Sequence, residues 1–206
     1  MIMRTLPVAF KGALSYNEFV ATWRTHLAIP KKELDKKGRV YQFYALYNQG
    51  RTSAVTEAFI PSEAIRAALK RIERPVHWLV LTEDWCADSA FSLPVIVKLA
   101  ALNEHITLNI LPRDANLDIM DRYLTNGARG IPKLIAFDPA TGDEVFQWGP
   151  RPQALVEARE AWKAAGADGK ELSKRSVEWY EEGGWRQVEG ELLALLTRAL
   201  APVSAS

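Results

Sequence analysis

Hydrophobic positions alternate between strand-like and helix-like spacing from Trp78 onward. The expected strands are Trp78–Thr82, Ile106–Leu111, Lys133–Phe137 and Glu144–Trp148, and the expected helices are Ala87–Asn103, Asn116–Thr125 and Pro152–Ala165. Asn126-Gly127 is a helix-stop signal, and the turn at Pro139–Asp143 makes the last two strands a hairpin. The order βαβαββα predicts an α/β fold with a central mixed sheet flanked by helices, part parallel and antiparallel at one edge.

Amphipathic helices are expected on both sides of this core. Two precede it, Tyr16–Leu27 and Ser62–Arg74, and two follow it, Lys170–Tyr180 and Val188–Leu200. Their apolar faces are too hydrophobic to remain in solvent, so they should pack on the core or against a second subunit. The domain organisation we expect is a helical N-terminal extension at residues 1–76, a core at 77–166 and a helical C-terminal extension at 167–206. The last residues, 202–206, should be frayed.

Composition and charge exclude several classes of function. The chain has 206 residues, of which 48% are hydrophobic and 25% charged, and its net charge is +1 from 26 basic and 25 acidic residues. This balance predicts no nucleic-acid partner and no anionic membrane surface, and no apolar run is long enough for a membrane span. Residues 1–11 lack the apolar stretch of a secretory signal. With one cysteine, no intramolecular disulfide can form, which favours a reducing cytoplasm.

The segment from Glu83 to Ser89 carries the candidate chemistry. Its Cys86 is the only cysteine, and it stands between a strand and a helix, where the helix dipole should stabilise a thiolate. Glu83, Asp84 and Asp88 oppose ionisation of the thiol by like charge and could nearly cancel that effect. The three histidines are scattered without metal-ligand spacing, so no metal site is expected.

Three features in order make the core resemble thioredoxin. Trp85-Cys86-Ala87-Asp88-Ser89 resembles the Trp-Cys-Gly-Pro-Cys motif, and Pro94 stands where thioredoxins have the proline that kinks the active-site helix. The segment from Gly127 to Phe137 resembles the one that contains the thioredoxin cis-proline. The resemblance covers roughly residues 78–165 and implies a thioredoxin-like fold with added extensions. The Asp-Trp-Cys-x-Asp-Ser core, the Trp148-Gly-Pro-Arg-Pro152 segment and a later Trp179-Tyr180 pair resemble a divergent bacterial subgroup.

The resemblance also implies the site residues. Cys86 and Ser89 occupy the two catalytic positions, and Trp85, Arg129, Ile131 and Pro132 would form the substrate-binding surface. Pro132 would be cis, leaving the Ile131 backbone free to pair with an extended peptide. Arg129 could reach Cys86 or a carboxylate such as that of glutathione, although a solvated role is favoured. The implied partners are protein or peptide thiols and disulfides, with glutathione as a candidate co-substrate and no bound cofactor.

Two departures from the thioredoxin pattern limit the chemistry. Ser89 replaces the resolving cysteine, and Val80 replaces the buried aspartate that helps thioredoxins move a proton. Both losses disfavour a dithiol reductase cycle, which needs a second thiolate. Two functions remain, limited monothiol redox chemistry at Cys86 and a non-enzymatic module that binds a peptide or protein. The retained cysteine motif favours the first slightly, while the losses favour the second.

Overall fold

The computed structural model describes residues 12–201, so the expectations for residues 1–11 and 202–206 lie outside it. The strands are β1 (Val76–Thr82), β2 (Ile106–Pro112), β3 (Lys133–Phe137) and β4 (Glu144–Trp148). They form one sheet in the order β2-β1-β3-β4. β1 pairs with β2 in parallel, and β3 is antiparallel to both β1 and β4. This confirms the expected mixed sheet.

Helices account for most of the remaining described chain. They are α1 (Tyr16–Ala28), α2 (Lys36–Ala58), α3 (Glu63–Lys70), α4 (Ala87–Ala100), α5 (Leu117–Met120), α6 (Gln153–Ala164), α7 (Gly169–Glu181) and α8 (Gln187–Ala199), with short 3-10 turns at Lys31–Glu33 and Gly184–Arg186. In the described part of the chain, no helix has the length and apolar character needed to cross a membrane.

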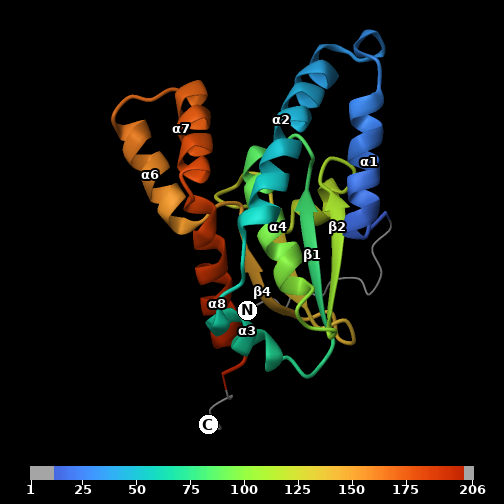
Figure 1. Cartoon of the computed structure of the whole chain (residues 1–206), viewed down its shortest axis with the longest axis vertical. Coiled ribbons are helices and arrows are strands. Elements are labelled where there is room, and N and C mark those ends of the chain that lie inside the picture. The colour runs from blue at the N-terminus through green and yellow to red at the C-terminus, as the bar shows by residue number, and fades with distance from the viewer. Residues whose placement is uncertain (1–11, 202–206) are drawn as a thin grey trace.

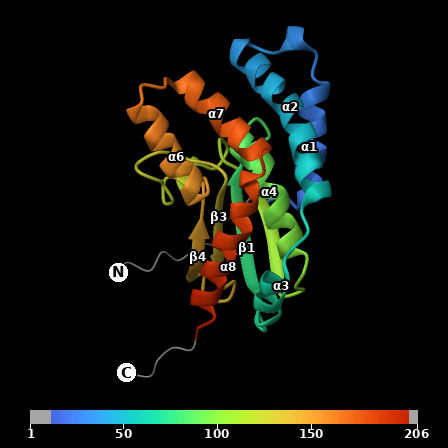
Figure 2. The ribbon, with the colours of Figure 1, turned by 60° about the vertical axis from the view of Figure 1, so that its left-hand side comes forward.

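Two helical hairpins stand at one end of the sheet, where β1 leads into α4. Figure 1 shows α1 and α2 on one side of this end and α6 and α7 on the other. The view in Figure 2 shows α8 running back along the sheet toward its opposite end, where α3 lies. The loop between β1 and α4, which contains Cys86, therefore lies between the two extensions.

The sheet separates two hydrophobic cores, because successive side chains of β1 point to opposite faces. On one face, Trp78 and Val80 pack in the larger core with α2, α4 and α8. On the other face, Leu79 and Leu81 pack in a smaller core that also contains Cys86. Cys86 thus lies in a hydrophobic cluster, and this burial affects the protonation of its thiol.

Helix α2 is the largest difference from the sequence-based expectation. Between the two expected N-terminal helices, the basic run at residues 31–39 is typical of a solvated helix face, whereas the aromatic segment 41–47 predicts no particular element. In the structure a single helix of 23 residues begins at Lys36, capped by the Asp35 carboxylate, which accepts a hydrogen bond from the Gly38 N–H. Buried and exposed aromatic or apolar residues occur on several sides of α2, so its sequence has no clear amphipathic period.

Helix α5 is shorter than expected. The expected helix ran over residues 116–125, whereas α5 ends at Met120. Beyond it the chain turns, and Thr125 and Ala128 form an isolated bridge around Gly127, which has a φ of 76°. The stop signal therefore marks this turn rather than the end of the helix.

A side chain from α2 compensates for the proline in α4. Pro94 has no N–H, so the Ala90 carbonyl loses the helical hydrogen bond that residue 94 would donate. The hydroxyl of Thr52 donates to this carbonyl instead, at 3.2 Å. The N-terminal extension thereby supports the helix that carries the cysteine.

Both extensions pack on the core. Phe19 and Trp23 of α1, and Val188, Leu192 and Leu196 of α8, are buried in the larger hydrophobic core. Burial of these side chains holds the extensions against the sheet and α4.

We predict that Leu192→Ala destabilises the protein by about 2–5 kcal/mol, since it leaves a cavity where a fully buried leucine packs. Urea denaturation followed by circular dichroism would measure the loss. Leu124→Ala is the matched control at an exposed leucine and should cost under about 0.5 kcal/mol. Equal losses for the two variants would show that α8 does not pack as described.

Candidate functional site

Cys86 is the N-cap residue of α4, in the loop that follows β1. Its side chain faces the segment before β3, and its Sγ donates a hydrogen bond to the Ile131 carbonyl at 3.3 Å. The Ile131–Pro132 peptide bond is cis. Only 8% of Cys86 is exposed. The structure thus brings Cys86, Ile131 and Pro132 together, but it places the thiol inside the protein.

Burial determines the protonation state of Cys86. It raises the pKa of the thiol to about 11, and the nearby negative charge of Asp88 adds to the rise. Hydrogen bonds from Ser89 and the positive charge of Arg151 oppose the rise without overcoming it. This corrects the expectation of a thiolate stabilised by the helix dipole, because the low-polarity surroundings outweigh the dipole. At neutral pH Cys86 is a neutral thiol that donates a hydrogen bond.

Ser89 is held in place by β1. The Thr82 hydroxyl donates to the Ser89 Oγ at 2.6 Å, and only 3% of Ser89 is exposed. Val80, at the position of the thioredoxin aspartate, is also fully buried. A serine Oγ cannot resolve a mixed disulfide, and Val80 has no group that can move a proton. The structure therefore offers no dithiol cycle at this site.

An ion pair beside the cysteine joins α4 to the segment before α6. The Arg151 guanidinium contacts the Asp88 carboxylate at 2.6 Å, and both side chains are mostly buried. Burial raises the pKa of Asp88 above its usual value, although the charge of Arg151 works against the rise. Asp88 stands in the first turn of α4, where an acidic residue favours helix formation, and it also forms this mostly buried ion pair with Arg151.

The Gly149–Arg151 segment lies against the loop that holds Pro132. Gly149 has a φ of 107°, and a side chain there would collide with the Pro132 carbonyl. Pro150 also packs closely on Gly130, since a Cβ at Gly130 would lie 2.8 Å from the Pro150 ring. These two close approaches hold the segment that places Arg151 beside Asp88.

The C-terminal extension reaches the same region through Tyr180 of α7. The Tyr180 ring stacks on Phe91 of α4, with 4.7 Å between centroids and an interplanar angle of 10°. Burial raises the pKa of Tyr180 well above its usual value, and the charge of Asp88 adds to the rise. Tyr180 is therefore a neutral side chain that packs on α4 close to Asp88.

Trp85 lies on the surface side of the cysteine, between two side chains from different elements. Its ring stacks on Tyr41 of α2, with 4.4 Å between centroids, and the Arg113 guanidinium lies 4.9 Å from its centroid. Arg113 also forms an ion pair with Asp114 at 2.6 Å. Trp85 is thus fixed in one orientation.

A pocket of about 360 Å³ opens beside Trp85. It is lined by aromatic, acidic and polar side chains from α1, α2 and the ends of β1 and β2: Phe19, Thr22, His26, Tyr41, Glu83, Asp84, Trp85, Pro112 and Asp114. This is a surface hollow with one aromatic wall and three carboxyl groups, adjacent to the cysteine motif.

The carboxyl groups in the pocket are fixed by hydrogen bonds. The Glu83 carboxylate accepts from the Asp114 N–H at 2.7 Å, and Asp84 contacts the His26 ring at 2.6 Å. Burial raises the pKa of Glu83 to about 7, and it also raises the pKa of Asp84 despite the His26 contact. The Asn48 amide donates to the Asp84 carbonyl at 2.9 Å, which ties α2 to this loop.

Arg129 is directed away from the cysteine. Its guanidinium forms two hydrogen bonds with the Asp121 carboxylate, at 2.6 and 2.8 Å, on the exposed surface. It makes no contact with Cys86. The solvated role favoured by the sequence thus fits the structure better than a role at the thiol.

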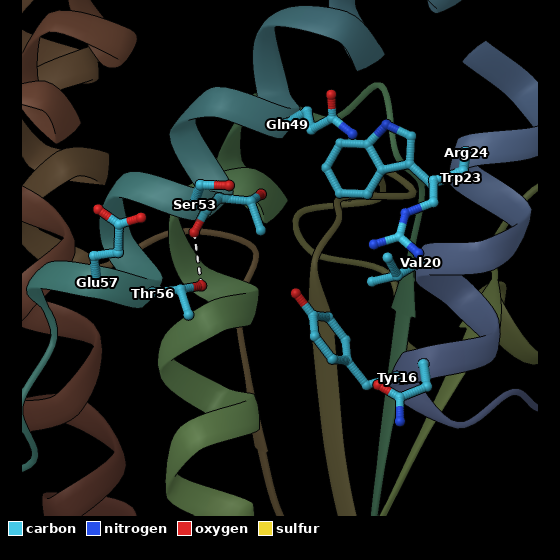
Figure 3. A pocket seen from close by; sticks show the side chains of 10 residues that line it. Tyr16, Val20, Trp23, Arg24, Gln49, Ser53, Thr56 and Glu57 are labelled. Atoms are coloured by element: carbon cyan, nitrogen blue, oxygen red, sulfur yellow. Dashed lines mark hydrogen bonds between the residues drawn. The ribbon is translucent and has the colours of Figure 1, made fainter. Parts of the chain in front are cut away.

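A second pocket, of about 340 Å³, lies between α1 and α2. Figure 3 shows Tyr16, Val20 and Trp23 on one wall and Gln49, Ser53 and Thr56 on the other. Neither Cys86 nor Trp85 lines it. Within residues 12–201 no group of three His, Cys, Asp or Glu side chains is arranged to hold a metal ion.

Several residues of the site were missed by the sequence analysis. His26, Tyr41 and Asn48 come from the N-terminal extension, and no sequence signal joins them to a loop that lies far along the chain. Arg151 could have been found, because it stands in the Trp148–Pro152 segment that contributed to the resemblance. Tyr180 lies beside the Trp179 noted in the same comparison.

Comparisons with known proteins agree with this geometry. A family model described as thioredoxin, Thioredoxin_9, matches residues 36–163, from the start of α2 to α6. No curated protein matches. Among solved structures, an HIV epitope scaffold is similar with 20% identity and a TM-score of 0.60, covering 91% of this chain and 94% of the scaffold. A protein of unknown function from Pseudomonas aeruginosa is similar with 19% identity and a TM-score of 0.57, covering 92% and 95%. At these identities the structural similarity shows the fold alone.

We predict that Asp88→Asn lowers the pKa of Cys86 below that of the natural protein. The substitution removes a negative charge beside the thiol and leaves the Arg151 charge unneutralised. The rate of alkylation by iodoacetamide as a function of pH would measure the change. Asp121→Asn, which breaks an exposed ion pair with Arg129, is the control and should leave the profile unchanged. An unchanged pKa in Asp88→Asn would contradict the assigned role of this charge.

We also predict that Glu83→Gln stabilises the protein at pH 8 but not at pH 4. The pKa of Glu83 is raised to about 7 in the folded state, so stability falls as pH rises through that value and a buried carboxylate forms. A neutral amide avoids this cost and can still accept from the Asp114 N–H. Thermal unfolding at both pH values would test this, with the exposed Glu104→Gln as control. The same difference at both pH values would contradict the titration of Glu83.

Proposed function

Because the chain belongs to the Thioredoxin_9 family of thioredoxins, we propose that it is a thioredoxin-fold module that binds polypeptide segments without catalysing disulfide exchange. The state of Cys86 carries this proposal. A thiol that is buried, with a pKa of about 11, and whose Sγ donates a hydrogen bond to Ile131 is protonated at neutral pH and is a poor nucleophile. Ser89 offers no second thiol.

The pocket beside Trp85 supports binding of a side chain from a partner. Its aromatic wall and carboxyl groups suit a segment that presents a lysine or arginine, because the long apolar stem can lie on Tyr41 while the charge meets Glu83 and Asp84. A bound cation would also favour ionisation of Glu83, whose pKa of about 7 leaves it partly protonated at neutral pH. Binding of a basic side chain would thus increase the negative charge of the pocket by promoting ionisation of Glu83.

The backbone near Pro132 supports binding of an extended segment. Considering residues 12–201, the Ile131 N–H makes no hydrogen bond, while the Ile131 carbonyl accepts from Cys86. A peptide strand placed there would gain a backbone donor next to the Trp85 pocket, as in recognition by strand addition. Cys86 would then serve as a fixed polar group in the floor of the site.

Monothiol redox chemistry is the second candidate, favoured by the position of the retained Cys86 at the start of α4 beside Ile131. In this reaction the Cys86 thiolate attacks the glutathione sulfur of a glutathionylated protein and releases the protein thiolate. The thiolate of a second glutathione then attacks the Cys86–glutathione disulfide, releases oxidised glutathione and restores Cys86. This function requires the site to open, because the thiol is only 8% exposed. Either function suits a reducing cytoplasm, where an unpaired thiol persists.

Selection from a displayed random-peptide library would test the binding function. We predict that the natural protein enriches sequences containing lysine or arginine, and that Cys86→Ala enriches the same sequences. Trp85→Ala should lose this enrichment, since it removes the pocket wall. Trp162→Ala, in the α6–α7 hairpin, is the matched control and should retain it.

Incubation with glutathionylated bovine serum albumin separates the two candidates. A binding module gives no glutathione adduct on Cys86 at neutral pH by mass spectrometry. Rapid formation of this adduct, together with loss of peptide enrichment in Cys86→Ala, would refute the binding module and support monothiol chemistry.

A further inference from the structure

One face of α2 carries large hydrophobic side chains that no part of the described chain covers. Val40, Phe43, Tyr44 and Tyr47 are 44, 55, 48 and 54% exposed, respectively. Their spacing places them on one side of the helix, opposite the buried Ala45. Together they expose about 400 Å² of apolar surface, a size that marks an interaction site on a soluble protein.

The size of the side chains on this face changes along the helix. Toward the C-terminal end of α2 it continues with the exposed small residues Gly50, Ala54 and Ala58. A Cβ added at Gly50 would meet nothing within 4 Å, so the glycine is not required by packing inside this chain. Large side chains thus occupy one half of the face and small ones the other half.

We propose that this face is the interface of a symmetric dimer in which α2 packs antiparallel against α2 of a second copy. With a two-fold axis at Tyr47, Phe43 of one copy lies over Gly50 of the other, and Val40 lies over Ala54. Phe43 and Val40 thus each meet a small residue, and the two Tyr47 rings meet at the axis. The large half of the face is complementary to the small half when two α2 helices run antiparallel. Such self-complementarity fits a second copy of this chain better than an unrelated partner.

Charge supports the same arrangement. Lys36 and Arg39 lie at the N-terminal end of α2, and Glu57 lies near its C-terminal end on the same flank as Arg39. Antiparallel packing brings Glu57 of each copy to Lys36 and Arg39 of the other, whereas parallel packing would place like charges together.

The area is of the order that a specific dimer needs. Two apolar patches of this size would bury about 800 Å², and the small residues and charged side chains beside them add to this toward the ~1,000 Å² of a biological interface. The opposite side of α2 holds Tyr41 against Trp85 and Asn48 against the Asp84 carbonyl. The dimer would therefore carry two Trp85 pockets on one rigid helical pair.

Sedimentation velocity from low to high micromolar concentration would test the dimer. We expect the natural protein to dimerise as concentration rises and Gly50→Arg to remain monomeric with unchanged circular dichroism. Val40→Glu should also be monomeric. Val145→Glu is the matched control, because Val145 is likewise 44% exposed but lies on β4, and it should dimerise normally. A natural protein that is monomeric throughout, or a Gly50→Arg variant that dimerises normally, would overturn the proposal.

Two further variants test the orientation. Glu57→Lys should weaken the dimer, and adding Lys36→Glu should restore part of the loss. Tyr47→Cys, made with Cys86→Ser, should form a disulfide-linked dimer on mild oxidation, whereas Val145→Cys in the same background should not. A dimer in which Tyr47→Cys does not cross-link would show that another surface is used.

Discussion

The packing of the Gly149–Arg151 segment over the start of α4 is the constraint on which the site depends. Gly149 allows this segment to pass the Pro132 carbonyl, and Pro150 packs on Gly130. Arg151 then reaches Asp88 at 2.6 Å, close to Cys86, which is itself buried in the smaller hydrophobic core. Once the thiol is enclosed, the cost of a buried anion outweighs the favourable position at a helix start. The neutral state of Cys86 follows from packing rather than from the motif that contains it.

The two extensions complete the site from opposite sides. From the N-terminal extension, Tyr41 fixes the Trp85 ring, Asn48 holds the Asp84 carbonyl and Thr52 replaces the hydrogen bond lost at Pro94. From the C-terminal extension, Tyr180 stacks on Phe91 of α4. The extensions are thus structural parts of the thioredoxin-like site, and the family match that begins at residue 36 agrees with this for α2.

The sheet was predictable from the sequence, because its strands have simple hydrophobic patterns and its motifs occur in a fixed order. Helix α2 was only partly predictable. Its residues serve three surroundings at once, the core at Ala45, the site at Tyr41 and an exposed face at Phe43, so no single amphipathic period results. The positions of Cys86 and Ile131 were also accessible from motif spacing. The protonation of the thiol was not, because it depends on burial among residues such as Leu81, Met120 and Ile131, which only the tertiary structure brings together.

The central claim is that Cys86 is a neutral, enclosed thiol. Since the chain has one cysteine, selective labelling with ¹³C-cysteine gives a single ¹³Cβ signal for Cys86. Its chemical shift as a function of pH reports the pKa directly in the folded protein. The structure predicts no titration through the neutral range and a midpoint near pH 11. A midpoint below about 8.5, the value of an unperturbed cysteine, would contradict the account.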